Sequence, residues 1–155
     1  MFNLRAPSSD LLYHAIAMVK EYQQLNPLSI NVYMKLGYFY LYLNEIENAE
    51  KTYNMADSLF PGNKNITLNR GIIAQRKKEF SKAINIFNSI IDEDEYKDVY
   101  TYLGSVYLEK EEPEKALEYF RKRVRINRNE DDPMYKEALK GIRNALQVQE
   151  DLNEK

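Results

Sequence analysis

Few side chains in this sequence have types and spacings suited to chemistry, and the first candidate is the single histidine, His14. A lone histidine in a helix cannot hold a metal ion by itself, and its helical neighbours Asp10 and Met18 indicate a surface turn. The sequence contains no cysteine, which excludes disulfides, thiolate zinc sites and cysteine nucleophiles. It also contains no glycine-rich phosphate loop and no Ser/His/Asp set. We therefore predict a protein that is not an enzyme and uses neither a cofactor nor a metal ion.

Two clusters of charge could serve a binding function. Residues 92–98, DEDEYKD, are acidic, and they could bind calcium or form a solvated junction, although they lack the glycine and regular ligand spacing of an EF-hand. Residues 121–128, RKRVRINR, are basic. They could form a nuclear-import or nucleic-acid patch, or they could be cations at the C-terminal end of a helix, where the dipole favours them. The net charge of −2 gives no general attraction to nucleic acid, so we expect no such partner.

The composition indicates a soluble, globular and intracellular chain. Of its 155 residues, 30% are charged and 44% are hydrophobic, which is enough for one domain with a sizeable core. No uncharged apolar run approaches the roughly 20 residues needed to span a bilayer. The first ten residues also lack the apolar core of a signal peptide. We expect a cytoplasmic protein that does not insert into a membrane.

Small and aromatic residues recur in three columns with spacings of 34 and 33 residues. The columns are Gly37, Gly71 and Gly104, then Ala49, Ala83 and Ala116, then Tyr53, Phe87 and Phe120. A half-unit precedes them, since Ala15, Val19 and Pro27 lie 34 residues before Ala49, Tyr53 and Pro61. Columns that repeat in phase at this period indicate stacked supersecondary units.

Each unit has room for two helices. In the first unit, four residues follow the i, i+3, i+4, i+7 spacing of one face of a helix: Tyr33, Leu36, Gly37 and Tyr40. A polar break begins at Asn44, and a second helix ends before Pro61. Antiparallel helices about 8–10 Å apart need small residues where they touch. We therefore expect Gly37 to meet Ala49, with Tyr53 filling the space beside the next unit.

This pattern resembles the tetratricopeptide repeat (TPR), a helix–turn–helix unit of about 34 residues. The first unit matches at Tyr33, Leu36, Gly37, Tyr40, Ala49, Tyr53, Ala56 and Pro61, with tyrosine in place of the usual tryptophan. The third unit departs at Arg123 and Arg128, where a small residue and a proline are usual. The middle unit is degenerate, with Thr67, Arg70, Ala74 and Glu95 at landmark positions. The resemblance covers about residues 9–128, and it implies an all-α fold, a right-handed superhelical solenoid.

The resemblance predicts a single TPR domain over residues 1–155. Its parts are a partial repeat at 9–27, a repeat at 30–63, a degenerate repeat at 64–96, a repeat at 97–130 and a capping helix at 133–151. Asp132 is expected to cap the last helix, with Pro133 at its first position. The apolar stripe of that helix is Tyr135, Ala138, Leu139, Ile142 and Leu146. One apolar and one polar side suit a terminal cap, and a helix that docks in a partner's groove is the alternative.

In arrays of this family the first helix of each unit lines a concave groove that binds segments of partner proteins. By resemblance, the groove residues here are Asn31, Met34, Tyr38, Leu41, Tyr42, Asn65, Leu68, Asn69, Ile72, Gln75, Arg76, Asp98, Thr101, Ser105 and Leu108. Tyrosine suits recognition because a rigid ring with a polar tip buries area at small entropic cost. The same side chains could instead pack against the N-terminal segment or a neighbouring repeat.

One specificity of the family is not expected. Some TPR domains hold the acidic tails of heat-shock chaperones with a clamp of lysine, arginine and asparagine. The corresponding places here are Met34, Tyr38, Asn69, Asp98 and Tyr102, of which only Asn69 fits. A carboxylate would meet Asp98 and no cation, so this function is unexpected.

We therefore predict an adaptor or scaffold that binds a peptide segment of another protein. The alternatives are a small chaperone for a secreted client, as in type III secretion, and a fragment of a longer TPR array. The first helix lacks a preceding partner, which would leave Leu11, Leu12, Ala15, Ile16 and Val19 with one side uncovered. Residues 1–7 could fold over that side, the chain could continue a longer array, or another molecule could cover it, including a second copy in a homo-oligomer.

Overall fold

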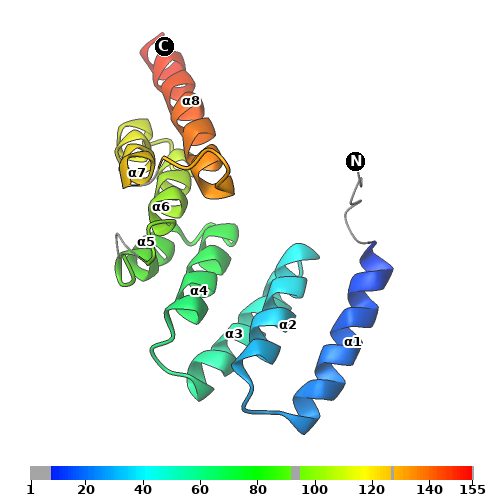
Figure 1. Cartoon of the computed structure of the whole chain (residues 1–155). Helices are drawn as coiled ribbons and strands as arrows, with labels where there is room; N and C mark the ends of the chain where they lie inside the picture. Colours follow the sequence, from blue (N-terminus) through cyan, green and yellow to red (C-terminus); the bar gives the residue numbers. More distant parts are fainter. Residues whose placement is uncertain (1–7, 92–94, 127, 155) are drawn as a thin grey trace. The chain divides into compact units, whose positions relative to one another are not determined.

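The computed structural model describes residues 8–91, 95–126 and 128–154, which form eight helices and no strand (Figure 1). The helices are α1 (Ser9–Leu25), α2 (Ile30–Tyr42), α3 (Ile46–Leu59), α4 (Lys64–Arg76), α5 (Phe80–Asn88), α6 (Val99–Glu109), α7 (Pro113–Ile126) and α8 (Pro133–Asn153). The predicted all-α fold is confirmed. The contacts fall into an N-terminal unit, residues 1–73, and a C-terminal unit, residues 74–155. That the chain forms a single domain stays a prediction.

An aromatic ring covers the glycine in each of two helix pairs. A Cβ added to Gly37 in α2 would lie within 3.0 Å of the ring of Tyr53 in α3. A Cβ on Gly104 in α6 would meet Phe120 of α7 in the same way. Tyr53 therefore fills space within its own helix pair, a contact that the sequence did not predict, while the contact between Gly37 and Ala49 stays a prediction. The ring of Tyr53 is 1% exposed, and this burial raises the pKa of its hydroxyl well above the usual range.

The ring of Phe120 is shared between two glycines. A Cβ on Gly141 in α8 would also lie within 3.0 Å of it, so α8 packs closely against α7. The buried residues of α8 are Tyr135, Ala138, Gly141 and Ala145. The predicted stripe is therefore partly wrong, since Leu139 and Leu146 are 38% and 40% exposed. Glycine takes position 141 because the ring of Phe120 leaves no room for a larger side chain there.

Each of three turns contains one residue whose backbone has the left-handed conformation. These residues are Asn44, Lys78 and Glu111, with φ of 60°, 59° and 58°. After each of them, the next backbone N–H donates to a carbonyl five residues earlier, from Glu45 to Tyr40, Glu79 to Ala74 and Glu112 to Tyr107, at 2.8–2.9 Å. This is the Schellman arrangement that ends a helix. Asparagine tolerates the left-handed backbone, whereas lysine and glutamate do so at a cost.

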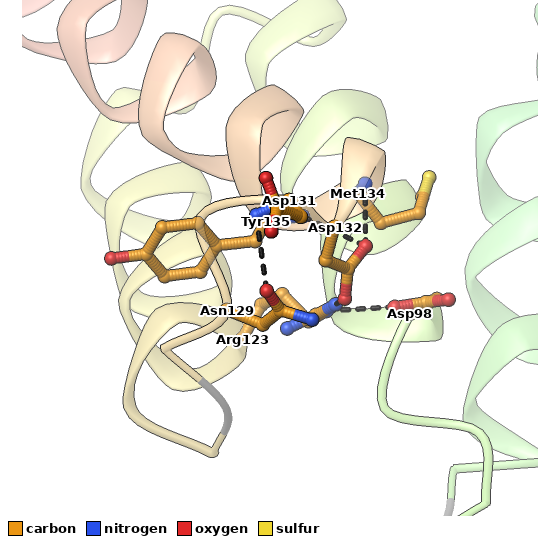
Figure 2. A network of polar contacts seen from close by, with 7 residues as sticks. All are labelled: Asp98, Arg123, Asn129, Asp131, Asp132, Met134 and Tyr135. Carbon is orange, nitrogen blue, oxygen red and sulfur yellow. Dashed lines mark hydrogen bonds and ion pairs between the residues drawn. The ribbon is translucent and has the colours of Figure 1, made fainter.

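An ion-pair network around the buried Arg123 joins three segments of the C-terminal unit (Figure 2). Arg123 of α7 is 0% exposed, and its Nε donates to Asp98 Oδ1 at 2.7 Å. A terminal guanidinium nitrogen donates to Oδ2 of Asp132. The other oxygen of Asp132 accepts from the backbone N–H groups of Met134 and Tyr135, at 2.8 and 3.4 Å. Asp132 thus caps α8, as predicted, and also pairs with the arginine that replaces the family's small residue.

We expect Gly37→Ala to destabilise the protein by about 1–3 kcal/mol, although alanine normally favours a helix over glycine by up to about 1 kcal/mol. The reason is the ring of Tyr53, which already occupies the space of the new Cβ. Denaturant unfolding would measure the change. In a Tyr53→Leu background, which lacks the ring, the same substitution should cost much less. Stabilisation by Gly37→Ala in the wild-type chain would contradict the packing.

Replacing Glu111 with glycine should stabilise the chain by about 0.5–1 kcal/mol, because glycine adopts the left-handed backbone without strain. Glu111→Ala is the matched control, since it also removes the carboxylate but keeps a Cβ. Thermal unfolding should show a gain for the glycine variant alone. Equal gains in both variants would show that the carboxylate, and not the backbone, is responsible.

Asp132→Asn should destabilise the C-terminal unit in a pH-dependent way. Desolvation raises the pKa of Asp132, but the hydrogen bonds from Arg123 and from the backbone N–H groups together lower this pKa by more. The net pKa of Asp132 is therefore below the usual value. The carboxylate therefore adds stability above its unfolded pKa of about 3.9, and that stability is lost as the pH falls through the lower folded value. Unfolding measured from neutral to acidic pH should show the wild-type advantage shrinking below about pH 4. A constant difference would contradict the ion pair.

Candidate peptide-binding surface

Helix α2 has an inner and an outward face, both set by helical spacing. Val32, Tyr33, Leu36, Tyr40 and Leu41 are buried in the core of the N-terminal unit. The outward positions are Asn31, Lys35, Tyr38 and Tyr42, which follow i, i+4, i+7, i+11 and are all exposed. Met34 lies beside them and is half-buried against the core. The surface formed by these five residues, Asn31, Met34, Lys35, Tyr38 and Tyr42, is called the α2 face below.

Two tyrosines give the α2 face its apolar character. Tyr38 is 59% exposed and Tyr42 46% exposed, and their ring centroids lie 6.4 Å apart. Tyr38 also contacts Phe39, with centroids 6.0 Å apart. Neighbouring rings of this kind are held in place by each other, so they offer a largely ordered apolar platform with two hydroxyl groups.

Lys35 adds a cation to this platform. It was not among the groove residues predicted from the sequence, although it completes the helical spacing between Asn31 and Tyr38. No ion pair joins Lys35 to any part of the chain that the structure describes. Its ammonium group is therefore open to an anionic group from outside.

A hollow of about 300 Å³ extends the α2 face towards α1. Its α2 wall is formed by Asn31, Val32 and Lys35. Its α1 wall is formed by Met18, Val19 and Tyr22. The hollow is therefore mainly apolar, and the amide of Asn31 and the ammonium group of Lys35, both of the α2 face, are among its lining groups.

Two predicted groove residues present little surface. Leu41 is 7% exposed and belongs to the core of the N-terminal unit. Thr101 is 2% exposed in the C-terminal unit. In both cases the helical stripe inferred from the sequence includes a side chain that is buried in the structure.

The predicted groove residues of α4 in the N-terminal unit are only partly accessible. Leu68, Asn69 and Ile72 are half-buried, and Ile72 packs against the core. The side-chain amide of Asn69 donates to the carbonyl of Asn65, at 2.8 Å. Asn65 itself is exposed.

Most of the predicted polar groove residues of the C-terminal unit bond to other groups of that unit. Gln75 donates to Glu109 at 2.6 Å, and Asp98 accepts from Arg123. The hydroxyl of Ser105 donates to the carbonyl of Thr101 at 3.0 Å. Arg76 is exposed and Leu108 half-buried.

The residues that could carry other chemistry are dispersed. His14 is exposed, and its Nδ1 lies 2.8 Å from the carbonyl oxygen of Asp10. Among the described residues, no group of three or more His, Asp or Glu side chains could hold a metal ion. Residues 92–94 of the acidic cluster lie outside the described ranges. Arg123 of the basic cluster is buried, so it is not part of a surface patch.

None of the described helices is both long enough and apolar enough to cross a membrane.

The fold is that of a helical-repeat protein. A family model described as tetratricopeptide repeat matches residues 30–63 and 98–130. The chain is 30% identical over 126 residues to a TPR repeat-containing protein of Methanocaldococcus jannaschii. This match covers 70% of the chain, but only 22% of the length of the relative. The chain belongs to the tetratricopeptide-repeat proteins, as its columns of glycine, alanine and aromatic residues predict.

Solved structures share the fold. A thermophilic TPR protein of Thermus thermophilus superimposes with a TM-score of 0.74 at 18% identity, over 86% of this chain and 74% of that one. The TPR2B domain of yeast Sti1, solved in a complex with pHsp70, superimposes with a TM-score of 0.66 at 19% identity. The match covers 76% of this chain and 96% of that one. At such identities the likeness concerns the fold alone. Tetratricopeptide repeats are generally non-catalytic modules that bind other proteins.

Proposed function

We propose that this chain is a non-enzymatic adaptor that binds a peptide segment of another protein on the α2 face. The observation that carries the proposal is the exposed pair Tyr38 and Tyr42 beside the cation of Lys35, which forms no ion pair with any described residue. Exposed apolar groups gathered on one face usually mark an interaction site, and tyrosine is enriched in such sites. The fold supports the same class of function, since a TPR domain of similar fold is solved in a complex.

The chemistry of the α2 face indicates what the segment contains. The rings of Tyr38 and Tyr42 and the thioether of Met34 favour aliphatic or aromatic side chains in the bound segment. Lys35 favours a carboxylate near them, and the amide of Asn31 can bond to the backbone of the segment. A tail with several carboxylates is not proposed, because the α2 face offers one cation. That Asn65, Leu68, Asn69 and Ile72 of α4 also belong to the site stays a prediction, as it does for the residues of the C-terminal unit.

Selection from a displayed library of random peptides would test the proposal. We expect sequences enriched in aromatic or aliphatic residues with one Asp or Glu between or beside them. Lys35→Glu should invert the charge preference towards Lys or Arg. A control selection would use the same chain unfolded in denaturant as the target. If the folded chain enriched no sequence relative to this control, the proposal would be contradicted.

Tyr38→Arg should weaken the binding of a selected peptide by about 2 kcal/mol, or roughly 30-fold, because the ring at the centre of the α2 face is lost. Titration calorimetry would measure the affinity. Met55→Arg is the matched control, since Met55 of α3 is similarly exposed, at 56%, and lies outside the α2 face. Both variants should keep wild-type helicity in circular dichroism. Equal loss of affinity in the two variants would place the site elsewhere.

A further inference from the structure

A second apolar surface runs along α1, and two of its residues, Met18 and Tyr22, also line the hollow beside the α2 face. Leu11, Met18, Tyr22 and Leu25 are 61%, 70%, 54% and 81% exposed. With the half-buried Ala15, they follow a spacing of 4, 3, 4 and 3 residues. This is the 3.5-residue repeat with which one helix packs along another. These five residues are called the α1 seam below.

The next helix pair in the chain shows what covers such a face. Ala15, Val19 and Tyr22 correspond to Ala49, Tyr53 and Ala56, which lie 34 residues later. These three residues of α3 are 0–1% exposed, and they share a core with α2, the antiparallel helix joined to α3 by a short turn. Leu12 and Ile16 of α1 are buried, which corrects the wider uncovered face expected from the sequence, whereas the seam residues Leu11, Met18, Tyr22 and Leu25 are exposed. An antiparallel helix is therefore the occupant that fits the seam.

The seam is complementary to itself when two copies run antiparallel and cross at Met18. Leu11 and Leu25 are each seven residues from Met18, so Leu11 of one copy lies opposite Leu25 of the other. Ala15 and Tyr22 are three and four residues from it, which places a small side chain opposite a large one.

The polar flank of the seam is complementary as well. His14 and Glu21 border it, four and three residues from Met18 on opposite sides. In the antiparallel arrangement the imidazole of one copy therefore faces the carboxylate of the other, and this happens twice by symmetry. Like charges do not oppose each other along this flank.

We propose that the α1 seam pairs with the same seam of a second copy, as an antiparallel two-helix contact that forms a symmetric dimer. In this dimer the α1 of the second copy occupies the place that α2 occupies on α3. The seam and the peptide site adjoin, because Met18 and Tyr22 also line the hollow beside the α2 face, but Tyr38, the central tyrosine of that face, lies outside the seam.

Sedimentation of the full chain over a range of concentrations would test the dimer. The wild-type chain should sediment as a monomer–dimer equilibrium, and Met18→Arg should raise the dimer dissociation constant by at least about tenfold. Met55→Arg, an equally long substitution at an exposed methionine of α3, should leave the dimer unchanged, as should Tyr38→Arg. A wild-type chain that stays monomeric, or a Met18→Arg dimer as strong as the wild type, would overturn the proposal.

Cysteine cross-linking would test the orientation, because the natural sequence has no cysteine. Under mild oxidation Met18→Cys should form a covalent dimer, since the two copies of position 18 meet at the symmetry axis. Leu11→Cys alone should not, whereas a mixture of Leu11→Cys and Leu25→Cys chains should. Cross-linking of Leu11→Cys with itself at the rate of Met18→Cys would show a parallel contact and contradict the proposal.

Discussion

The contact on which the helix pairs depend is an aromatic ring resting on a glycine. Tyr53 covers Gly37, and Phe120 lies between Gly104 and Gly141. Because the ring occupies the place of a Cβ, the paired helices can approach only where the glycine stands. This fixes the rotation of α2 about its axis. Once Gly37 faces α3, helical geometry leaves Asn31, Lys35, Tyr38 and Tyr42 on the outward side. The proposed site is thus a consequence of the packing on the opposite side of the same helix.

The two units have different residues at the same buried position of the repeat. In the N-terminal unit, Ala56 occupies the small-residue position of α3 and is fully buried. In the C-terminal unit the corresponding residue is Arg123, which is equally buried but needs two carboxylates to balance its charge. One of these carboxylates, Asp98, is a predicted groove residue. The network therefore stabilises the start of α8 and uses a polar group that could otherwise have contacted a partner.

The periodic features were predictable from the sequence alone. The columns of Gly, Ala and aromatic residues gave the helix pairs, and the pair Asp132 and Pro133 gave the start of α8, because these features reflect local geometry. Features that depend on tertiary contacts were missed. The burial of Arg123 requires carboxylates from two other segments, and the exposure of Leu139 and Leu146 depends on which side of α8 packs against the rest of the unit. The left-handed Lys78 and Glu111 carry no preference for that backbone.

The α2 face could be predicted only in part. Its tyrosines follow from helical spacing and the family resemblance, whereas the role of Lys35 depends on the absence of an ion-pair partner in the described part of the chain. Leu41 and Thr101 were included because a single helix leaves the width of an outward stripe undetermined. The neighbouring helices set that width.

Mapping amide chemical shifts by NMR, with a selected peptide added to the labelled chain, tests the central claim most directly. The account predicts that the largest shifts fall on Asn31, Lys35, Tyr38 and Tyr42, while the amides around Arg123 and along α8 change little. Shifts concentrated in α7 and α8, with the α2 face unchanged, would contradict it.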